Sequence, residues 1–339
     1  MDYYERLGKI GEGASAIVYL ARDLRTGETV AVKRLRPGLG GDGDVDEETF
    51  QREVRCLEAC RGHPSLVALR AAHWDPRAGG GAFLVMEHIG PSLARIMKED
   101  RAGRPFPEAE ARRVMRRLLE GVSAMHGLGF LHRDIKPDNV LVRGDFDVVK
   151  ICDFGLSRAT SSPAAAAPLY TSGVVTLWYR APELMLGSTE YDAGVDTWAL
   201  GCVMAELLTG GKPLFPGRSE MDQLNRVFDT VGMQDMRSWP GFARLPRAES
   251  ALCRRSRPPG RLREMFPELS AAGFDVLSGL LSCRPDRRLT VVEALRRPWF
   301  DEVVVVAPPP VAQHDQPRVT CCCAGYSTDV SSVAEAILA

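Results

Sequence analysis

The segment LHRDIKPDNVL, residues 131–141, decides which fold the sequence predicts. It sets six polar or charged side chains between apolar residues on both sides: His132, Arg133, Asp134, Lys136, Asp138 and Asn139. Ordering such a cluster against apolar neighbours is unfavourable unless the charges are paired or put to use. The segment is therefore a candidate site, and the stretches on either side of it indicate its chemistry.

The composition is that of a globular chain without a specialised surface. The 339 residues are 45% hydrophobic, enough for one large domain or two lobes with a sizeable core. The formal net charge is -1 and no long basic block occurs, so neither a nucleic acid nor a membrane surface is an expected partner. No signal segment or long apolar run is present. We expect an intracellular protein, in the nucleus and/or cytoplasm, with reduced cysteines.

The first ninety residues predict a small β-rich lobe. Its strand-like segments, rich in branched and aromatic residues, are 4–10, 16–23, 29–35 and 81–88. One helix, at 47–60, interrupts them, with acidic residues in its first turn.

Beyond residue 105 the pattern becomes helical. Apolar residues recur at helical spacing over 108–126, and the stretch 197–211 is apolar nearly all round, as in a helix buried in a large lobe. We therefore predict an α+β protein with two lobes, a mainly β lobe at about 4–87 with one key helix and a larger, mainly α lobe at about 90–300. These form one domain at 4–300, and the aperiodic segment 301–339 is predicted to be a poorly ordered tail.

A glycine-rich turn, GEGASAIV at 11–18, separates two of the predicted strands. Glycines let backbone N–H groups approach phosphate oxygens closely. A hairpin turn explains Gly11 and Gly13 equally well, and Ala16 replaces the third glycine of a G-x-G-x-x-G pattern. The strand VAVK, which comes next and ends in Lys33, favours the phosphate interpretation.

Lys33 needs an acidic partner if it is buried, and the helix at 47–60 supplies a candidate. Glu53 falls within the apolar stripe of Phe50, Val54 and Leu57. An acid on an inward face is unfavourable unless it is paired. Glu53 could instead be solvated at the edge of the stripe; together with Lys33, an ion pair is the better account.

A third motif is VKICDFGLSR, residues 149–158, in which a strand-like run is broken by Asp153-Phe154-Gly155. A carboxylate at the end of a strand, before a glycine, suits a metal ligand that faces a nucleotide. Asp-x-Gly is also common turn chemistry. The position of the triplet shortly after Asn139 favours the metal interpretation.

Together and in this order, the motifs resemble those of the eukaryotic protein kinases, over roughly residues 4–300. The matching set ends with Ala181-Pro182-Glu183. The resemblance implies the bilobal protein-kinase fold, with ATP and Mg²⁺ as cofactors. The residues that it implies around ATP are Ile10, Gly11, Glu12, Gly13, Ala14, Ser15, Ala16, Ile17, Val18, Lys33, Glu87 and Ile89.

The resemblance also implies roles for the charged residues. Asp134 would orient the substrate hydroxyl and accept its proton, while Asn139 and Asp153 would hold Mg²⁺. Lys33, held by Glu53, would bind the α- and β-phosphates. Lys136, which would meet the γ-phosphate, is typical of Ser/Thr kinases.

Two longer stretches resemble the cyclin-dependent-kinase branch, within the CMGC group: YTSGVVTLWYRAPELMLG at 170–187 and FPGRSEMDQLNRVFDTVG at 215–232. In that branch Thr176 and Arg180 belong to the substrate pocket, which implies Ser/Thr-Pro sites in protein substrates. Thr171 matches an activating phosphothreonine made by an upstream kinase, unless it is simply an exposed loop threonine. The arginines that would bind its phosphate are Arg52, Arg133 and Arg158.

The departures from this branch bear on regulation. The helix at 47–60 keeps only Arg52-Glu53 of the Pro-Ser-Thr-Ala-Ile-Arg-Glu signature, so a cyclin is a candidate partner, and whether the chain depends on one is left open by the sequence. A cyclin-independent kinase-activating kinase of the same branch is one alternative. A kinase-shaped scaffold is another, disfavoured because Lys33, Asp134, Asn139 and Asp153 are all present. A non-kinase nucleotide enzyme is disfavoured because no G-x-x-x-x-G-K-[ST] loop occurs.

Overall fold

The computed structural model describes residues 3–13, 15–36, 47–75, 81–160, 177–248 and 260–301. The chain divides into a unit at Met1–Val303 and a second unit at Val304–Ala339, and all the described residues belong to the first unit. Three predicted site residues, Ala14, Thr171 and Thr176, lie outside the described residues, as does the predicted tail beyond Asp301. None of the helices in the described ranges is long and apolar enough to cross a membrane.

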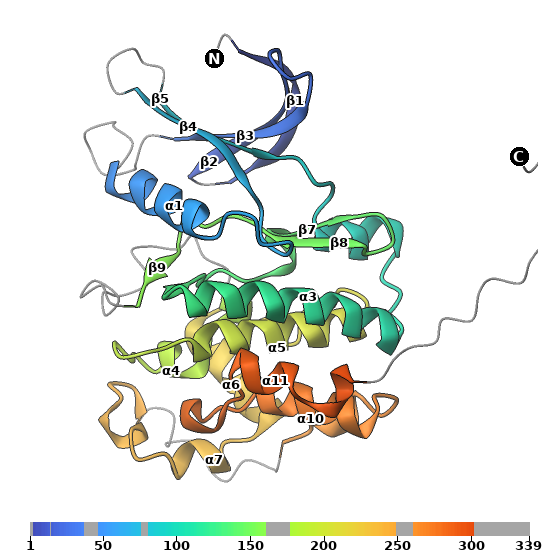
Figure 1. The fold of residues 1–339 in the computed structure, drawn as a ribbon. Coiled ribbons are helices and arrows are strands. Elements are labelled where there is room, and N and C mark those ends of the chain that lie inside the picture. The colour runs from blue at the N-terminus through green and yellow to red at the C-terminus, as the bar shows by residue number, and fades with distance from the viewer. Residues whose placement is uncertain are drawn as a thin grey trace, which may run out of the picture. The chain divides into compact units, whose positions relative to one another are not determined.

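A five-stranded antiparallel sheet forms the N-terminal part, in the order β1-β2-β3-β5-β4 (Figure 1). The strands are β1 Tyr4–Glu12, β2 Ala16–Asp23, β3 Thr29–Leu35, β4 Leu69–Asp75 and β5 Gly81–Glu87. Helix α1, Glu47–Ala59, accompanies the sheet. In β3, Lys33 pairs with Val18 of β2 and Leu84 of β5, so the central strand of the sheet carries it.

The sequence pattern predicted four of these strands and missed β4. Its sequence, LRAAHWD, has no β-branched residue, so its own propensity for strand is weak. Pairing with β5, in the register Trp74 to Ala82, makes it a strand, and that register depends on a partner distant in the fold rather than on local sequence.

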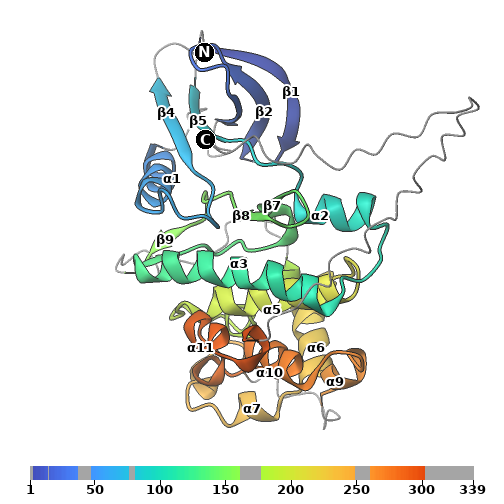
Figure 2. The ribbon, with the colours of Figure 1, turned by 45° about the vertical axis from the view of Figure 1, so that its right-hand side comes forward.

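Helices make up the larger part of the molecule, below the sheet in Figures 1 and 2. They are α2 Leu93–Arg95, α3 Glu108–Gly127, α4 Pro182–Met185, α5 Gly194–Leu208, α6 Glu220–Val231, α7 Gln234–Arg237, α9 Leu262–Met265, α10 Ala271–Leu280 and α11 Val291–Leu295, with a π-helical turn at Ile96–Asp100. Single 3₁₀ turns occur at Pro137–Asn139, Leu177–Tyr179, Phe242–Arg244, Pro285–Arg287 and Pro298–Phe300. Helix α5 is buried almost all round, as its composition predicted, and packs against α3 and α10. The α+β, two-lobed fold class is confirmed.

Two short two-stranded antiparallel sheets lie between the five-stranded sheet and the helices (Figure 1). β7 Val140–Arg143 pairs with β8 Val148–Ile151, and β6 Phe130–Leu131 pairs with β9 Arg158–Ala159. Gly90, which follows β5, approaches β7 so closely that a Cβ there would overlap the carbonyl of Val142. The loops that leave these short strands carry the predicted site.

Candidate active site

Lys33 and Glu53 form a buried ion pair between β3 and α1. The distance from Lys33 Nζ to Glu53 Oε1 is 2.6 Å, and their side chains are 7% and 1% exposed. The same Nζ lies 2.7 Å from Oδ1 of Asp153. Glu53 reaches inward because it shares the buried face of α1 with Phe50, Val54 and Leu57. One ammonium group thus joins three segments that are far apart in the sequence.

The electrostatics of this cluster keep Lys33 and Asp153 charged near neutral pH. Burial opposes the ammonium, but the carboxylates of Glu53 and Asp153 outweigh it and raise the pKa of Lys33. The charge of Lys33 in turn lowers the pKa of Asp153 to about 2. Burial raises the pKa of Glu53, against the attraction of Lys33. Asp153 is therefore an ionised oxygen donor at the centre of the site.

Asp196 of α5 holds the loop at 131–141 in place through hydrogen bonds to its backbone. Its carboxylate accepts the backbone N–H of His132 at 2.9 Å and that of Arg133 at 2.7 Å, and lies 2.9 Å from the ring Nε2 of His126. These bonds fix Arg133 at a φ of 72°, a left-handed conformation that is unfavourable for a residue with a side chain. Burial opposes ionisation, but the contacts with His126 and the loop hold the pKa of Asp196 below its ordinary value. Asp196 thus braces the loop.

Asp134 is polarised on one oxygen and open on the other. Lys136 Nζ donates to its Oδ2 at 2.7 Å and Asn139 Nδ2 to the same atom at 2.9 Å. Within the ranges that the structure describes, no hydrogen bond engages Oδ1 of Asp134. A hydroxyl could donate to Oδ1 without displacing an existing partner.

His132 connects this loop to the Asp153-Phe154-Gly155 motif. Its Nδ1 accepts the backbone N–H of Asp134 at 3.2 Å, so Nε2 carries the proton and donates to the carbonyl of Cys152 at 3.1 Å. The ring also packs on buried Phe154, with centroids 5.4 Å apart. Burial raises the pKa of the Cys152 thiol, as expected for an inert thiol beside the site.

The oxygen donors of Asn139 and Asp153 fit a hard divalent cation. The amide Nδ2 of Asn139 donates to the backbone oxygen of Asp134 at 2.8 Å, which orients the opposite amide atom, Oδ1, as an acceptor. Asp153 supplies an ionised carboxylate. Mg²⁺ in phosphoryl-transfer sites takes only one or two protein side chains, since phosphate and water complete the octahedron. The lack of a cluster of three acidic, His or Cys ligands among the described residues is therefore compatible with such a site.

The residues expected around the nucleotide lie along β1, β2 and the end of β5. Ile10, Gly11 and Glu12 end β1, and Ala16, Ile17 and Val18 begin β2. Gly13 donates its N–H to the carbonyl of Ala16 at 2.9 Å and closes the turn that also contains Ser15. The carboxylate of Glu87 accepts the N–H of Ala68 at 2.8 Å and pairs with Lys150 at 2.5 Å, so its side chain is already bonded. Ile89, two residues later, is buried.

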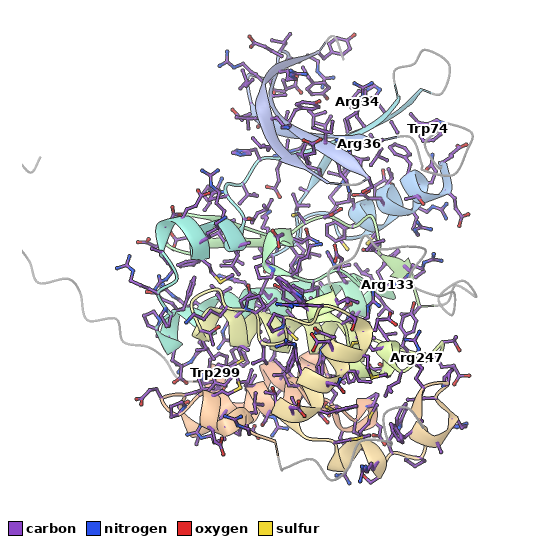
Figure 3. All side chains as sticks on the ribbon, turned by 180° about the vertical axis from the view of Figure 1, so that it is seen from behind. Arg34, Arg36, Trp74, Arg133, Arg247 and Trp299 are labelled. Atoms are coloured by element: carbon purple, nitrogen blue, oxygen red, sulfur yellow. The ribbon has the colours of Figure 1, made fainter. Side chains whose placement is uncertain are left out.

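The three arginines expected to bind a phosphate come from three elements. Arg52 lies on α1, directly before Glu53, and donates to Thr49 Oγ1 at 2.8 Å. The guanidinium of Arg133 (labelled in Figure 3) lies 5.7 Å from the ring centroid of Tyr191. Arg158 lies in β9, opposite Leu131. Burial raises the pKa of Tyr191, and the positive charges of Arg133 and Arg158 oppose the rise, so both guanidiniums act electrostatically on that tyrosine.

Arg180 has a partner that sequence reasoning missed. Its Nη1 lies 2.7 Å from Oε1 of Glu220, in the first turn of α6, and Glu220 also binds Arg247. Buried Arg180 signals that an acid is required, but Glu220 is forty residues away and is not marked out by its own surroundings in the sequence. The neighbouring Trp178 donates from Nε1 to the carbonyl of Gly217 at 3.1 Å.

The Ala181-Pro182-Glu183 motif is anchored by Arg288. Its guanidinium binds Glu183 through two bonds of 2.7 and 2.8 Å and also donates to the carbonyl of Gly194 at 2.8 Å. Both side chains are buried, so this charge-assisted pair holds the motif in place.

Comparison with protein families decides what this arrangement is. The family model of the protein kinase domain matches residues 4–300. The chain is a protein kinase. It is 67% identical, over the full length of both chains, to a rice (Oryza sativa subsp. japonica) protein that carries the name putative cyclin-dependent kinase F-2. It is also 40% identical to cyclin-dependent kinase G1 of Arabidopsis thaliana and 36% identical to human cyclin-dependent kinase 11B.

The kinase covers its relatives to different extents. It spans the whole of the rice protein, but only 50% of the Arabidopsis protein and 39% of the human one, over 89% and 94% of its own length. The matches place it in the cyclin-dependent-kinase-like branch and support Ser/Thr kinase function, which requires ATP, a divalent cation and protein substrates.

Proposed function

We propose that this kinase phosphorylates Ser/Thr-Pro sites with Mg-ATP, and that phosphorylation of Thr171 by an upstream kinase activates it. The observation that carries the catalytic part is the bonding of Lys33 to both Glu53 and Asp153, at 2.6 and 2.7 Å. This network fixes a cation and an ionised carboxylate side by side, and positioning and neutralising phosphate charge would need such a pair.

The chain's own residues divide the work of phosphoryl transfer. Lys33 would hold the phosphates of the bound nucleotide, and Asp134 would orient the substrate hydroxyl and accept its proton at Oδ1. Asn139 and Asp153 would hold Mg²⁺, which supplies charge neutralisation for the phosphates. Lys136 already lies 2.7 Å from Asp134 and adds a positive charge beside the transferred group. Each role is electrostatic or positional, so rates should depend on single charges.

Preference for proline is tested with a pair of peptides. One contains Ser-Pro and the other Ser-Ala, with otherwise identical sequences, and both are incubated with the purified chain, Mg²⁺ and ATP. We expect kcat/KM to be at least about tenfold higher for the Ser-Pro peptide, because a shaped pocket discriminates by roughly this much per group. Equal values for the two peptides would remove the proline-directed proposal and leave the kinase assignment intact.

Activation through Thr171 is tested by Thr171→Ala. We expect an upstream activating kinase to raise the activity of the wild-type chain by about tenfold or more and to leave the variant unchanged, because a phosphate among arginines makes several strong, charge-assisted bonds. Ser172→Ala, at the adjacent hydroxyl, is the matched control and should respond like the wild type. Full activation of Thr171→Ala would refute the switch.

A further inference from the structure

The Lys33–Glu53 ion pair requires α1 to lie close to β3. Other contacts of the helix must therefore hold it in that position. The open face of α1 offers an apolar partner little to bind: its exposed positions include Glu48, Arg55, Glu58 and Ala59, and among described residues 47–61 no large hydrophobic side chain is exposed. The contacts that hold the helix must therefore be sought on its buried face.

That face is anchored by an aromatic pair one helical turn before Glu53. Phe50 is 3% exposed, and its ring centroid lies 5.2 Å from that of Trp74 in β4, with the planes inclined at 39°. Figure 3 shows Trp74 beside α1, at the edge of the sheet. Residues three apart on a helix lie on the same face, so Phe50 and Glu53 both point from the buried face of α1. Leu57, fully buried one turn later, completes the support.

The aromatic pair is part of the same core as the catalytic motif. Phe50, Leu57 and Phe154 belong to one continuous cluster of buried residues, against which Trp74 packs. The opposite face of β4 packs on a separate cluster that contains Phe83, and the exposed ring of His73 stacks on Phe83 with centroids 4.7 Å apart. Strand β4 therefore carries two ring contacts, of which only Phe50–Trp74 includes a residue of α1.

We infer that Phe50 and Trp74 are positioning residues for phosphoryl transfer, which keep Glu53 on Lys33 from within the chain and without a partner on the exposed face of α1. The inference concerns the regulation of the kinase site and rests on its kinase activity, not on proline preference or on Thr171.

The first experiment measures how exposed Lys33 is. The full-length chain, without nucleotide, is treated briefly with an amine-reactive ester, and labelling at Lys33 is quantified by mass spectrometry. We expect Trp74→Ala to increase labelling and to lower kcat/KM by about two- to tenfold, the range that one aromatic pair supports. Trp74→Phe, which keeps a ring, should restore both values to within about twofold of the wild type.

His73→Ala is the matched control, since it removes a ring contact from the same strand on the other face. It should leave labelling at Lys33 unchanged. If His73→Ala and Trp74→Ala increase labelling equally, the effect is general loosening of the sheet and the inference is overturned.

A double-mutant cycle separates positioning from packing. Residues that act through one another show non-additive effects. In a Glu53→Gln background the pair with Lys33 is already weakened, so Trp74→Ala should add little further labelling. Full additivity would mean that Trp74 does not act through Glu53 and would overturn the inference. The labelling requires no turnover, so the result stands even if the peptide assays contradict the proposed substrate.

Discussion

Asp134→Asn should slow phosphoryl transfer by about 10²–10⁴-fold, the usual contribution of a positioned general base. The variant keeps an acceptor oxygen and nearly the same shape, so the contacts with Lys136 and Asn139 at 2.7 and 2.9 Å can largely persist. What is lost is the negative charge that draws the proton from the substrate hydroxyl. We therefore expect kcat to fall while the KM for ATP changes little.

The matched control is Asp138→Asn, the same change four residues later in the same loop, at an exposed carboxylate. Initial rates with a Ser-Pro peptide, Mg²⁺ and ATP, measured for both variants and the wild type, test the prediction. Asp138→Asn should retain most of the activity. If Asp134→Asn retains wild-type kcat, Asp134 is not the base. If even the wild type remains silent after treatment with an upstream kinase and cyclins, the scaffold alternative is favoured.

The sequence predicted those parts of the fold whose signal is local. Alternating and branched residues located β1, β2, β3 and β5, and apolar residues at helical spacing located α3. Strand β4 was not predicted, because it forms a strand through pairing with β5 rather than through the propensity of its own residues. On α3, Arg112 is buried, with its guanidinium 5.5 Å from the ring centroid of Trp299. That contact joins residues far apart in the sequence.

In the site, too, a contact with a local sequence signal could be predicted and a contact without one could not. The pairing of Lys33 with Glu53 could be predicted because an acid within an apolar stripe requires a cation. The partner of Arg180 could not, because Glu220 is one of many acidic residues and only the tertiary fold brings it close. Lys136 and Asn139 both donate to Oδ2 of Asp134 rather than to Oδ1. This also depends on side-chain geometry, which a sequence motif does not encode.

The second large effect concerns a buried acid of α5, Glu206. It is 6% exposed and accepts a hydrogen bond of 2.7 Å from the hydroxyl of Tyr179, next to Arg180. Burial raises the pKa of Glu206 from the ordinary 4.5 to about 7; the bond from Tyr179 opposes this rise, and the charge of Asp138 adds to it. A carboxyl group that titrates near neutral pH therefore lies under the segment that carries Arg180.

The direction of the effect is set by proton linkage. Between pH 4.5 and 7 the folded protein keeps a proton on Glu206 that the unfolded chain has lost. The contribution of Glu206 to the free energy of unfolding therefore falls as the pH rises. Above pH 7 the carboxyl group of Glu206 is ionised in both the folded and the unfolded state, and the loss of stability is complete. One pKa unit corresponds to about 1.4 kcal/mol, so the full loss is about 3 kcal/mol.

Glu206→Gln removes this pH dependence, because the amide resembles the protonated acid and can still bond to Tyr179. We expect the variant and the wild type to have similar free energies of unfolding at pH 4.5, and the variant to be more stable by up to about 3 kcal/mol at pH 8. Urea unfolding of both chains at the two pH values measures the difference, and comparison at each pH cancels the other titrating groups. Glu58→Gln, at an exposed site of α1, controls for the change in net charge. A variant that is less stable than the wild type at pH 8 would show instead that Glu206 is needed there as a carboxylate, bound to Tyr179.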